Sequence, residues 1–285
     1  MTPYGMYLQS QPGYLIMQDF DGGAFHASEK PVTQEHVQAV LRRISGTDVA
    51  IDALHVATTW TDRSRQATSY RNGRILLAGD AAHIHSPLGG QGLNLGLGDA
   101  MNLGWKLAAT IRDQAPEGLL ESYCAERHPL GAQVLDWSRA QVAIMRPSPG
   151  ERALNTIMRD LIATRDGATY IAEQVWGIHT HYDLGGSHPL AGKSVPNFVF
   201  GDDATIGELM RDGRAILLDF GTNAALEAAA DDYNGRIKYV TRGAKERSAA
   251  SAMLIRPDGI VAWACGDDAD CGELHMAAAR WFGSR

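Results

Sequence analysis

The sequence has few of the features that mark secreted, membrane or nucleic-acid-binding proteins. Its 285 residues hold three cysteines, which are too few and too unevenly spaced for a disulfide framework. No window approaches the roughly 18 uninterrupted apolar residues of a membrane span, and the N-terminus has no charged segment followed by an apolar one. The 26 Lys and Arg residues are scattered among 33 Asp and Glu residues, so no basic patch is available for phosphates. We therefore expect a soluble cytoplasmic protein without nucleic-acid or membrane partners.

The N-terminal part predicts strands around one helix. Hydrophobic residues make up 45% of the chain, enough for a sizeable core. The runs Met6–Leu8 and Tyr14–Met17 favour β structure and flank a Pro-Gly turn, which indicates a hairpin. Thr33 is placed to cap a helix over residues 34–44, and Val49–Trp60 then resumes a strand-like pattern.

The middle part begins with an apolar run, Arg74–Leu77, that leads to Gly79 and Asp80. A continuous apolar run of this kind predicts a strand buried on both faces, whose end delivers a polar side chain to a ligand crevice. Helical spacing of apolar and small residues follows from Leu93 to Ile111, and we expect this helix to pack closely on a flat surface.

Two further helices are expected as structural cover. One spans residues 118–143 with an interruption near Pro129, and the other spans residues 153–176 with Gly167 as a weak point. On the long helices, Trp105 and Lys106 are expected to pack and to solvate, and the neighbours Glu126 and Arg127 to tie helices together.

The sequence texture changes at a linker-like stretch near Gly185. Apolar runs after it predict a separate α/β domain of about 95 residues. Its expected strands are Ala215–Phe220, Ile237–Thr241, Ala252–Ile255 and Ile260–Cys265, with a hairpin turn at Arg256–Gly259. Five residues separate Cys265 from Cys271, so the redox Cys-x-x-Cys geometry is not expected.

The segment from Gly79 to Asn94 has the chemistry of a ligand site. The glycines at 89, 90 and 92 let a flat ligand approach the backbone, and they lead directly into a helix N-terminus that favours negative charge. Asp80, an acceptor when ionised, suits a hydroxyl donor. A polyol that carries a delocalised anionic ring meets both demands.

This segment closely resembles the C-terminal flavin signature of the class A FAD-dependent aromatic hydroxylases, particularly the polyketide-antibiotic hydroxylases. The pattern Arg-x-x-Leu-x-Gly-Asp-Ala-Ala-His, then Pro-x-Gly-Gly-x-Gly-Leu-Asn and Asp-Ala-x-Asn-Leu-x-Trp-Lys-Leu, matches almost throughout from Arg74 to Leu107. The resemblance continues through Tyr123–Pro129 and His188–Leu190. It implies a mixed α/β (α+β) fold in three parts: residues 1–73 in a substrate-binding sheet, 74–184 completing the FAD-binding domain with the following helices, and 185–285 as a thioredoxin-like domain.

The resemblance also implies roles for individual residues. Pro87 would lie beside the reacting edge of the flavin and is the candidate catalytic residue. The other candidate cofactor-binding residues are Gly79, Asp80, Gly89, Gly90, Gly92, Leu93 and Asn94. The candidate substrate contacts are Tyr14, Thr58 and Trp60. The implied reaction hydroxylates an aromatic or polyketide-type substrate with FAD, NADPH and oxygen.

One departure from the family pattern limits this assignment. The Gly-x-Gly-x-x-Gly turn that binds the FAD pyrophosphate is absent before Arg74, so we expect the chain to be incomplete and to need a separate N-terminal half or a homo-oligomer. The alternative is a non-catalytic remnant that serves as a binding or assembly module. A weaker alternative is a metal-assisted hydrolase built on Asp80, His83 and His85, and we assign no metal ligand.

Overall fold

The computed structural model describes residues 5–21, 25, 30–245, 250–266 and 270–283. The chain divides into two compact units, each made of separate segments. The first comprises Met1–Ala67, Asp80–Asn94 and Gly131–Val175, and the second comprises Thr68–Gly79, Leu95–Leu130 and Trp176–Arg285. Across the described ranges, no helix combines the length and the hydropathy that a membrane span requires.

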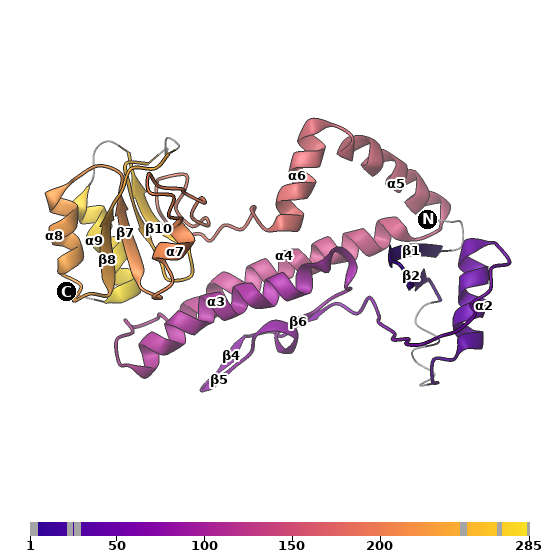
Figure 1. The fold of residues 1–285 in the computed structure, drawn as a ribbon. Helices are drawn as coiled ribbons and strands as arrows, with labels where there is room; N and C mark the ends of the chain where they lie inside the picture. Colours follow the sequence, from indigo (N-terminus) through magenta and orange to yellow (C-terminus); the bar gives the residue numbers. More distant parts are fainter. Residues whose placement is uncertain (1–4, 22–24, 26–29, 246–249, 267–269, 284–285) are drawn as a thin grey trace. The chain divides into compact units, whose positions relative to one another are not determined.

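Helices and strands alternate irregularly along the chain (Figure 1). The strands are β1 (Gly5–Gln11), β2 (Tyr14–Asp19), β3 (Arg65–Gln66), β4 (Arg71–Asn72), β5 (Ile75–Leu76), β6 (His83–Ile84), β7 (Ala215–Asp219), β8 (Ile237–Thr241), β9 (Ala252–Ile255) and β10 (Val261–Cys265). The α-helices are α2 (Gln34–Ser45), α3 (Gln91–Ile111), α4 (Glu121–Met145), α5 (Pro149–Ile162), α6 (Arg165–Trp176), α7 (Ile206–Leu209), α8 (Ala224–Asp231) and α9 (Cys271–Phe282). Two single 3-10 turns, η1 (Gly79–Ala81) and η2 (Leu88–Gly90), precede α3.

The N-terminal hairpin and its helix form as the sequence predicts. Strands β1 and β2 pair antiparallel, and α2 begins at Thr33, whose side chain accepts a hydrogen bond from the backbone N–H of His36. Ile44 of α2 is fully buried and approaches Gly5 so closely that a Cβ there would lie 2.8 Å from its Cγ2. Glycine at position 5 therefore lets the helix pack on the hairpin.

The predicted strand at Val49–Trp60 is wrong. Residues 48–64 contain no strand, because side chains of α2 take the backbone groups that a neighbouring strand would pair. Gln34 donates to the carbonyl of Ile51 and accepts from the N–H of Leu54, and Gln38 accepts from the N–H of Ile51. The segment is extended, but a helix surface satisfies it instead of a sheet.

The expected strand at Arg74–Leu77, buried on both faces, is also corrected. The structure forms a two-residue strand, β5, and among the described residues it pairs only with β4 in a short antiparallel hairpin. Ile75 on this strand is 66% exposed. A strand is buried on both faces only when a larger sheet surrounds it, and the described residues supply no such sheet at this position.

The long helices differ from the prediction in three details. Helix α4 runs through Pro129 without interruption, since a proline removes a single N–H while the turns on either side keep their own bonds. The expected helix over residues 153–176 is two helices, α5 and α6, and Thr164 between them accepts a hydrogen bond from the N–H of Gly167. Helix α3 forms as predicted, but Leu93, Leu97 and Met101 along it are 75%, 55% and 57% exposed.

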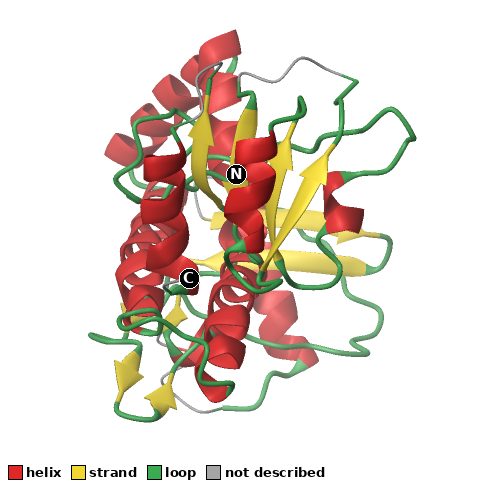
Figure 2. Cartoon of the chain, turned by 90° about the vertical axis from the view of Figure 1, so that its left-hand side faces the viewer, coloured by secondary structure: helices red, strands yellow, loops and turns green. Residues whose placement is uncertain are grey.

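The C-terminal segment forms a four-stranded sheet in the order β10-β9-β7-β8, at the predicted strands and the predicted turn. Strands β7 and β8 pair parallel, and the other pairs are antiparallel. Leu217 packs with α8 and α9 on one face, and Ile216 and Leu218 pack with Phe198, Phe200 and Ile206 on the other. Figure 2 shows the strands of this sheet side by side with helices against them.

The fold class is confirmed as a mixed helix-and-sheet architecture with a C-terminal thioredoxin-like sheet domain. The three-part division at residues 73 and 184 stays a prediction.

Candidate functional site

The candidate cofactor residues lie on two short segments, and most of them face solvent. Asp80 is exposed in turn η1, which begins at Gly79 with a φ of 58°. Turn η2 carries Gly89 and Gly90, with φ values of 80° and 63°, and leads without a break into α3. These left-handed backbone conformations strongly favour glycine.

The glycine turn is backed on one side and open on the other. A Cβ at Gly89 would lie 2.9 Å from the side-chain Oε1 of Gln141, whereas a Cβ at Gly90 would meet no heavy atom within 4 Å. The N–H of Gly90 donates to the carbonyl of Pro87 at 3.1 Å, which closes the turn and leaves Pro87 exposed. The outer side of this turn therefore offers backbone to a flat ligand.

The first turn of α3 supplies the remaining candidate residues. Leu93 and Asn94 are exposed and Gly92 is half-buried. A Cβ at Gly92 would lie 3.5 Å from Nε2 of His85, a buried atom that has no hydrogen-bond partner in the described part of the chain. Partial positive charge gathers at the start of a helix, so this position favours an electron-rich oxygen or an anionic ring.

The candidate residues fit a flavin in two respects. Among the described residues no hydrogen bond or ion pair engages the Asp80 carboxylate, so it remains available to a ribitol hydroxyl. The open side of Gly90 accommodates a ring that a side chain would block. The third demand of FAD, a pyrophosphate site, has no counterpart in the glycine turn, since that turn follows a loop and does not emerge straight from a strand.

The candidate substrate residues are not brought together by any described contact. Tyr14 on β2 is 62% exposed, and Thr58 and Trp60 lie in the strand-free stretch, exposed and half-buried respectively. Their assignment stays a prediction.

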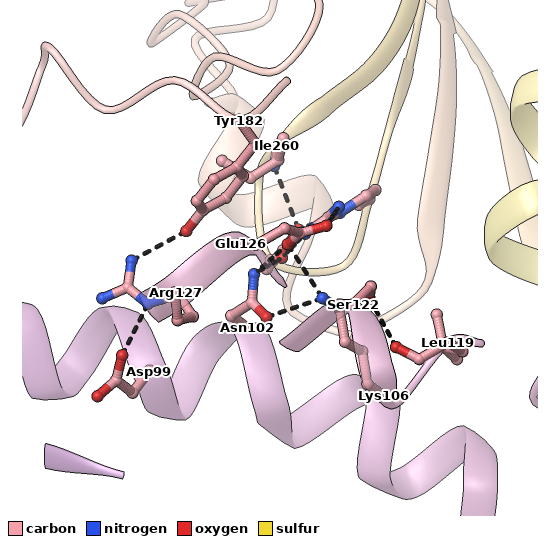
Figure 3. Close-up of polar contacts among 11 residues, drawn as sticks. Asp99, Asn102, Lys106, Leu119, Ser122, Glu126, Arg127, Tyr182 and Ile260 are labelled. Atoms are coloured by element: carbon pink, nitrogen blue, oxygen red, sulfur yellow. Dashed lines mark hydrogen bonds and ion pairs between the residues drawn. The ribbon is translucent and has the colours of Figure 1, made fainter. Parts of the chain in front are cut away.

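The backbone N–H of Gly79 belongs to a buried hydrogen-bond network. This N–H donates to Oδ2 of Asp99 at 2.9 Å, and Oδ1 of Asp99 accepts from Nε of Arg127 at 2.7 Å. Arg127 also donates to the hydroxyl of Tyr182 and to the carbonyl of Leu95, at 2.9 and 2.8 Å. Figure 3 shows Arg127 between Asp99 and Tyr182. The expectation that Arg127 ties helices together holds, and the sequence did not indicate the contact to Gly79.

A second network on the same two helices joins them to the β9–β10 hairpin. Arg256 donates to both carboxylate oxygens of Glu126, at 2.8 and 2.9 Å, and Nε of Arg256 donates to Asp258 at 3.0 Å. Lys106 donates to Glu126 at 3.0 Å and to Asn102 at 2.8 Å (Figure 3). We call Asn102, Lys106, Glu126, Arg256 and Asp258 the charge cluster.

Burial and charge shift the pKa values in this cluster in a consistent way. Burial raises the pKa of Glu126, but the hydrogen bonds and charge of Arg256, with help from Lys106, outweigh burial and hold it at about 2. Burial lowers the pKa of Lys106 to about 8; the charge of Glu126 opposes this shift, and the charge of Arg256 adds to it. Lys106 is fully buried, so the expectation that it solvates the helix is wrong.

The cluster has no open face for a substrate. Asn102, Lys106 and Arg256 are each at most 1% exposed, and the Arg256 guanidinium lies 4.3 Å from the ring centroid of Trp281. The conspicuous charges of this region are therefore structural. Over the ranges that the structure describes, no group of three His, Cys, Asp or Glu side chains is arranged to hold a metal.

Two family models match successive parts of the chain. Residues 10–138 match a family model described as a FAD binding domain, and residues 188–284 match one described as the C-terminal domain of aromatic-ring hydroxylases. This order of domains defines a class of flavoprotein hydroxylases. These matches confirm the resemblance of the chain to the FAD-dependent aromatic hydroxylases.

Individual relatives extend the match over almost the whole chain. A protein described as a monooxygenase from Claviceps purpurea is 46% identical over 99% of this chain and 55% of its own length. A 12-dehydrotetracycline 5-monooxygenase/anhydrotetracycline 6-monooxygenase from Streptomyces rimosus is 39% identical over 99% of this chain and 60% of its own length. The solved OxyS anhydrotetracycline hydroxylase from Streptomyces rimosus superposes with a TM-score of 0.88 at 36% identity, covering 98% of this chain and 58% of that one. The chain thus spans a little over half the length of these relatives.

Proposed function

We propose that this chain supplies the flavin-ring end of a FAD-dependent monooxygenase that hydroxylates an aromatic, polyketide-type substrate with NADPH and oxygen. The observation that carries the proposal is the open, left-handed turn at Gly89 and Gly90, which leads directly into α3. The exposed Asp80 carboxylate, which has no partner among the described residues, adds to it. Bound flavin supplies the redox chemistry and the activation of oxygen. The protein residues then need only to bind, orient and exclude water.

The candidate residues divide into flavin and substrate contacts in this proposal, and Gly79 places Asp80. Asp80 accepts a hydrogen bond from a ribitol hydroxyl, and Pro87 borders the reacting edge of the ring. The backbone of Gly89, Gly90, Gly92, Leu93 and Asn94 would hold the ring, and the partial positive charge at the start of α3 would favour negative charge on it. Tyr14, Thr58 and Trp60 contact the aromatic substrate.

The pyrophosphate and adenosine contacts come, in this proposal, from a dinucleotide-binding region outside these 285 residues, on the same or on another polypeptide. The exposed apolar side chains of Leu93, Leu97 and Met101 recur every four residues along α3 and support this proposal. Such a continuous apolar stripe favours an interaction surface. The short strand β5, with Ile75 66% exposed, adds apolar surface of the same kind.

Flavin titration with and without the complementing region tests the proposal. FAD fluorescence is measured as the 285-residue chain is added, alone and together with the dinucleotide-binding region of the Streptomyces rimosus relative supplied in trans. We expect weak quenching by the chain alone and tight binding by the pair, because the chain offers contacts to ribitol and ring only. Tight stoichiometric binding by the chain alone would show that the complementing region is unnecessary.

NADPH consumption separates the enzyme from its alternative. A monooxygenase oxidises NADPH faster when an aromatic substrate such as anhydrotetracycline is added to the complemented protein, and it forms an oxygenated product. A non-catalytic binding or assembly module, the second candidate function, binds neither flavin nor substrate in a way that accelerates NADPH oxidation. Flavin binding without any turnover on a panel of polycyclic phenols would favour this second function.

A further inference from the structure

Two buried side chains that bond to each other, Asp99 and Arg127, bond to backbone at Gly79 and at Leu95. We propose that Arg127 is a positioning residue for the flavin site: it fixes the backbone just before Asp80 and just after Asn94. This inference rests on the proposed function, because it assigns a role toward the same site. Its geometric part, the anchoring of the backbone, is independent of flavin.

The first segment is held through Asp99. One oxygen of the Asp99 carboxylate accepts the N–H of Gly79 at 2.9 Å, and the other accepts Nε of Arg127 at 2.7 Å. Asp80 follows Gly79 directly in the sequence, so the carboxylate proposed to bind ribitol leaves the backbone at an anchored point. The hydroxyl of Tyr123 donates to the carbonyl of Leu77 at 2.8 Å and steadies the same strand end.

The second segment is held directly. Nη2 of Arg127 donates to the carbonyl of Leu95 at 2.8 Å, and Leu95 follows Asn94, the last of the candidate flavin residues. One guanidinium therefore bonds to the second segment directly and to the first through Asp99, and its planar set of donors fixes both bonds in a way that a single ammonium cannot. Nη1 of Arg127 donates to Tyr182 at 2.9 Å, which orients the plane of the guanidinium.

The network is built for rigidity. Asp99 is fully buried and Arg127 is 3% exposed, so water does not compete for these bonds. Two glycines of α3 make room for the network. A Cβ at Gly96 would lie 3.4 Å from the Cα of Gly79, and a Cβ at Gly98 would lie 2.8 Å from Nη2 of Arg127.

Helix packing alone does not explain this arrangement. The charge cluster already joins α3 to α4 through Lys106 and Glu126. Arg127 is the next residue along α4. It bonds to the Leu95 carbonyl, beside Asn94, and to Asp99, which in turn bonds to Gly79. The bond that helix packing does not explain is the one from the N–H of Gly79, which lies outside both helices, to the Asp99 carboxylate that Arg127 holds.

A pair of matched glycine variants tests the anchoring without removing a charge. In Gly98→Ala the new methyl group displaces the guanidinium, whereas in Gly104→Ala, on the same helix, a Cβ would meet nothing within 4 Å. Alanine favours a helix more than glycine does, so neither variant should unfold the chain. We expect exchange of the Gly79 amide hydrogen to rise about tenfold or more in Gly98→Ala and to stay unchanged in Gly104→Ala, as measured by NMR. Unchanged exchange in Gly98→Ala would overturn the anchoring.

A double-mutant cycle connects the anchoring to flavin. We expect Arg127→Lys to weaken FAD binding by the complemented protein about tenfold, and Gly98→Ala to add little on that background, because the group it displaces is already gone. Fully additive effects, or a loss of affinity that tracks only the melting temperature, would reduce Arg127 to a structural residue. Asp80→Ala, which removes the acceptor, separates the two claims: unchanged FAD affinity in that variant contradicts the proposed flavin contact, while Gly79 exchange still decides the anchoring.

Discussion

Helix α3 exposes the polar residue Asn94 near its start and buries polar residues further along, while apolar side chains are exposed in both parts. At its N-terminal end, Leu93 and Asn94 are exposed and the preceding glycines leave backbone open to solvent. Further along, Asp99, Asn102 and Lys106 are buried and fully engaged with residues of α4 and the β9–β10 hairpin. The comparison teaches that the conspicuous charges of this protein hold it together, while the candidate cofactor site consists of glycine, backbone and one exposed carboxylate.

The largest effect that would sharpen this comparison is expected from Glu126→Gln. The change leaves Arg256 and Lys106 buried beside a neutral partner, and breaking a buried pair in this way costs about 3–5 kcal/mol. Urea unfolding, followed by tryptophan fluorescence, measures the free energy of unfolding. The matched control is Glu121→Gln on the same helix, whose side chain is 66% exposed and which pairs with Arg71, and it should cost at most about 1 kcal/mol. Equal costs for the two variants would contradict a structural role for the charge cluster.

Low pH should reduce the stability that the charge cluster contributes. The pKa of Glu126 is about 2 in the folded chain against an ordinary value of 4.5, so the unfolded chain takes up this proton first as the pH falls. The stabilisation is present above about pH 4.5 and is lost as the pH drops toward 2, by about 3 kcal/mol in total. Unfolding free energies measured between pH 6 and pH 3 (roughly the accessible range) should fall more steeply for the wild-type chain than for Glu126→Gln. Parallel pH profiles would show that Glu126 titrates normally.

Both predictions concern Glu126, which the sequence indicated as a residue that ties helices together without indicating Arg256 as its partner. Local signals predicted the β1–β2 hairpin, the Thr33 cap and the strands β7 to β10 correctly, because turn residues, caps and short apolar runs act on neighbouring backbone. The strand at Val49–Trp60 was wrong because Gln34 and Gln38, distant in sequence, satisfy its backbone. Burial of the run at Arg74–Leu77 depends on sheet neighbours, which its own residues do not specify.

The candidate site was predictable to a similar, partial degree. The glycines and Asp80 form a contiguous pattern, and their left-handed turns and exposure agree with the expected chemistry. The support for that site was not predictable, since the contact between Gly79 and Asp99 joins residues 20 positions apart and depends on the packing of α4. A pattern in sequence identifies the residues that meet a ligand more readily than those that hold them in place.

In the exposed candidate cofactor site, Asp80→Ala should weaken FAD binding and leave the free energy of unfolding unchanged. Removing a charged acceptor from a ribitol hydroxyl costs about 1.5–3 kcal/mol, or about one to two decades in FAD affinity. The exposed side chain has no described partner, so the free energy of unfolding should stay within about 0.5 kcal/mol of wild type. Asp136→Ala, at an exposed ion pair with Arg139 on α4, is the control for loss of a surface carboxylate. Equal flavin affinity in wild type and Asp80→Ala would remove Asp80 from the site.

The smallest effect on turnover is expected from the two cysteines of the C-terminal segment. Cys265 and Cys271 are free thiols at the end of β10 and the start of α9. Burial raises the pKa of the Cys265 thiol, which disfavours the reactive thiolate, and the flavin already carries the electrons of the proposed reaction. Replacing both cysteines with serine should therefore leave substrate turnover by the complemented protein intact. The one expected cost, about 1 kcal/mol of stability, comes from placing a hydroxyl at the buried position 265, and Cys271→Ser alone should show almost none of it. Turnover that disappears while melting temperature and flavin content stay unchanged would make the thioredoxin-like domain part of the chemistry, and it would end the separation between a structural region and a reacting one.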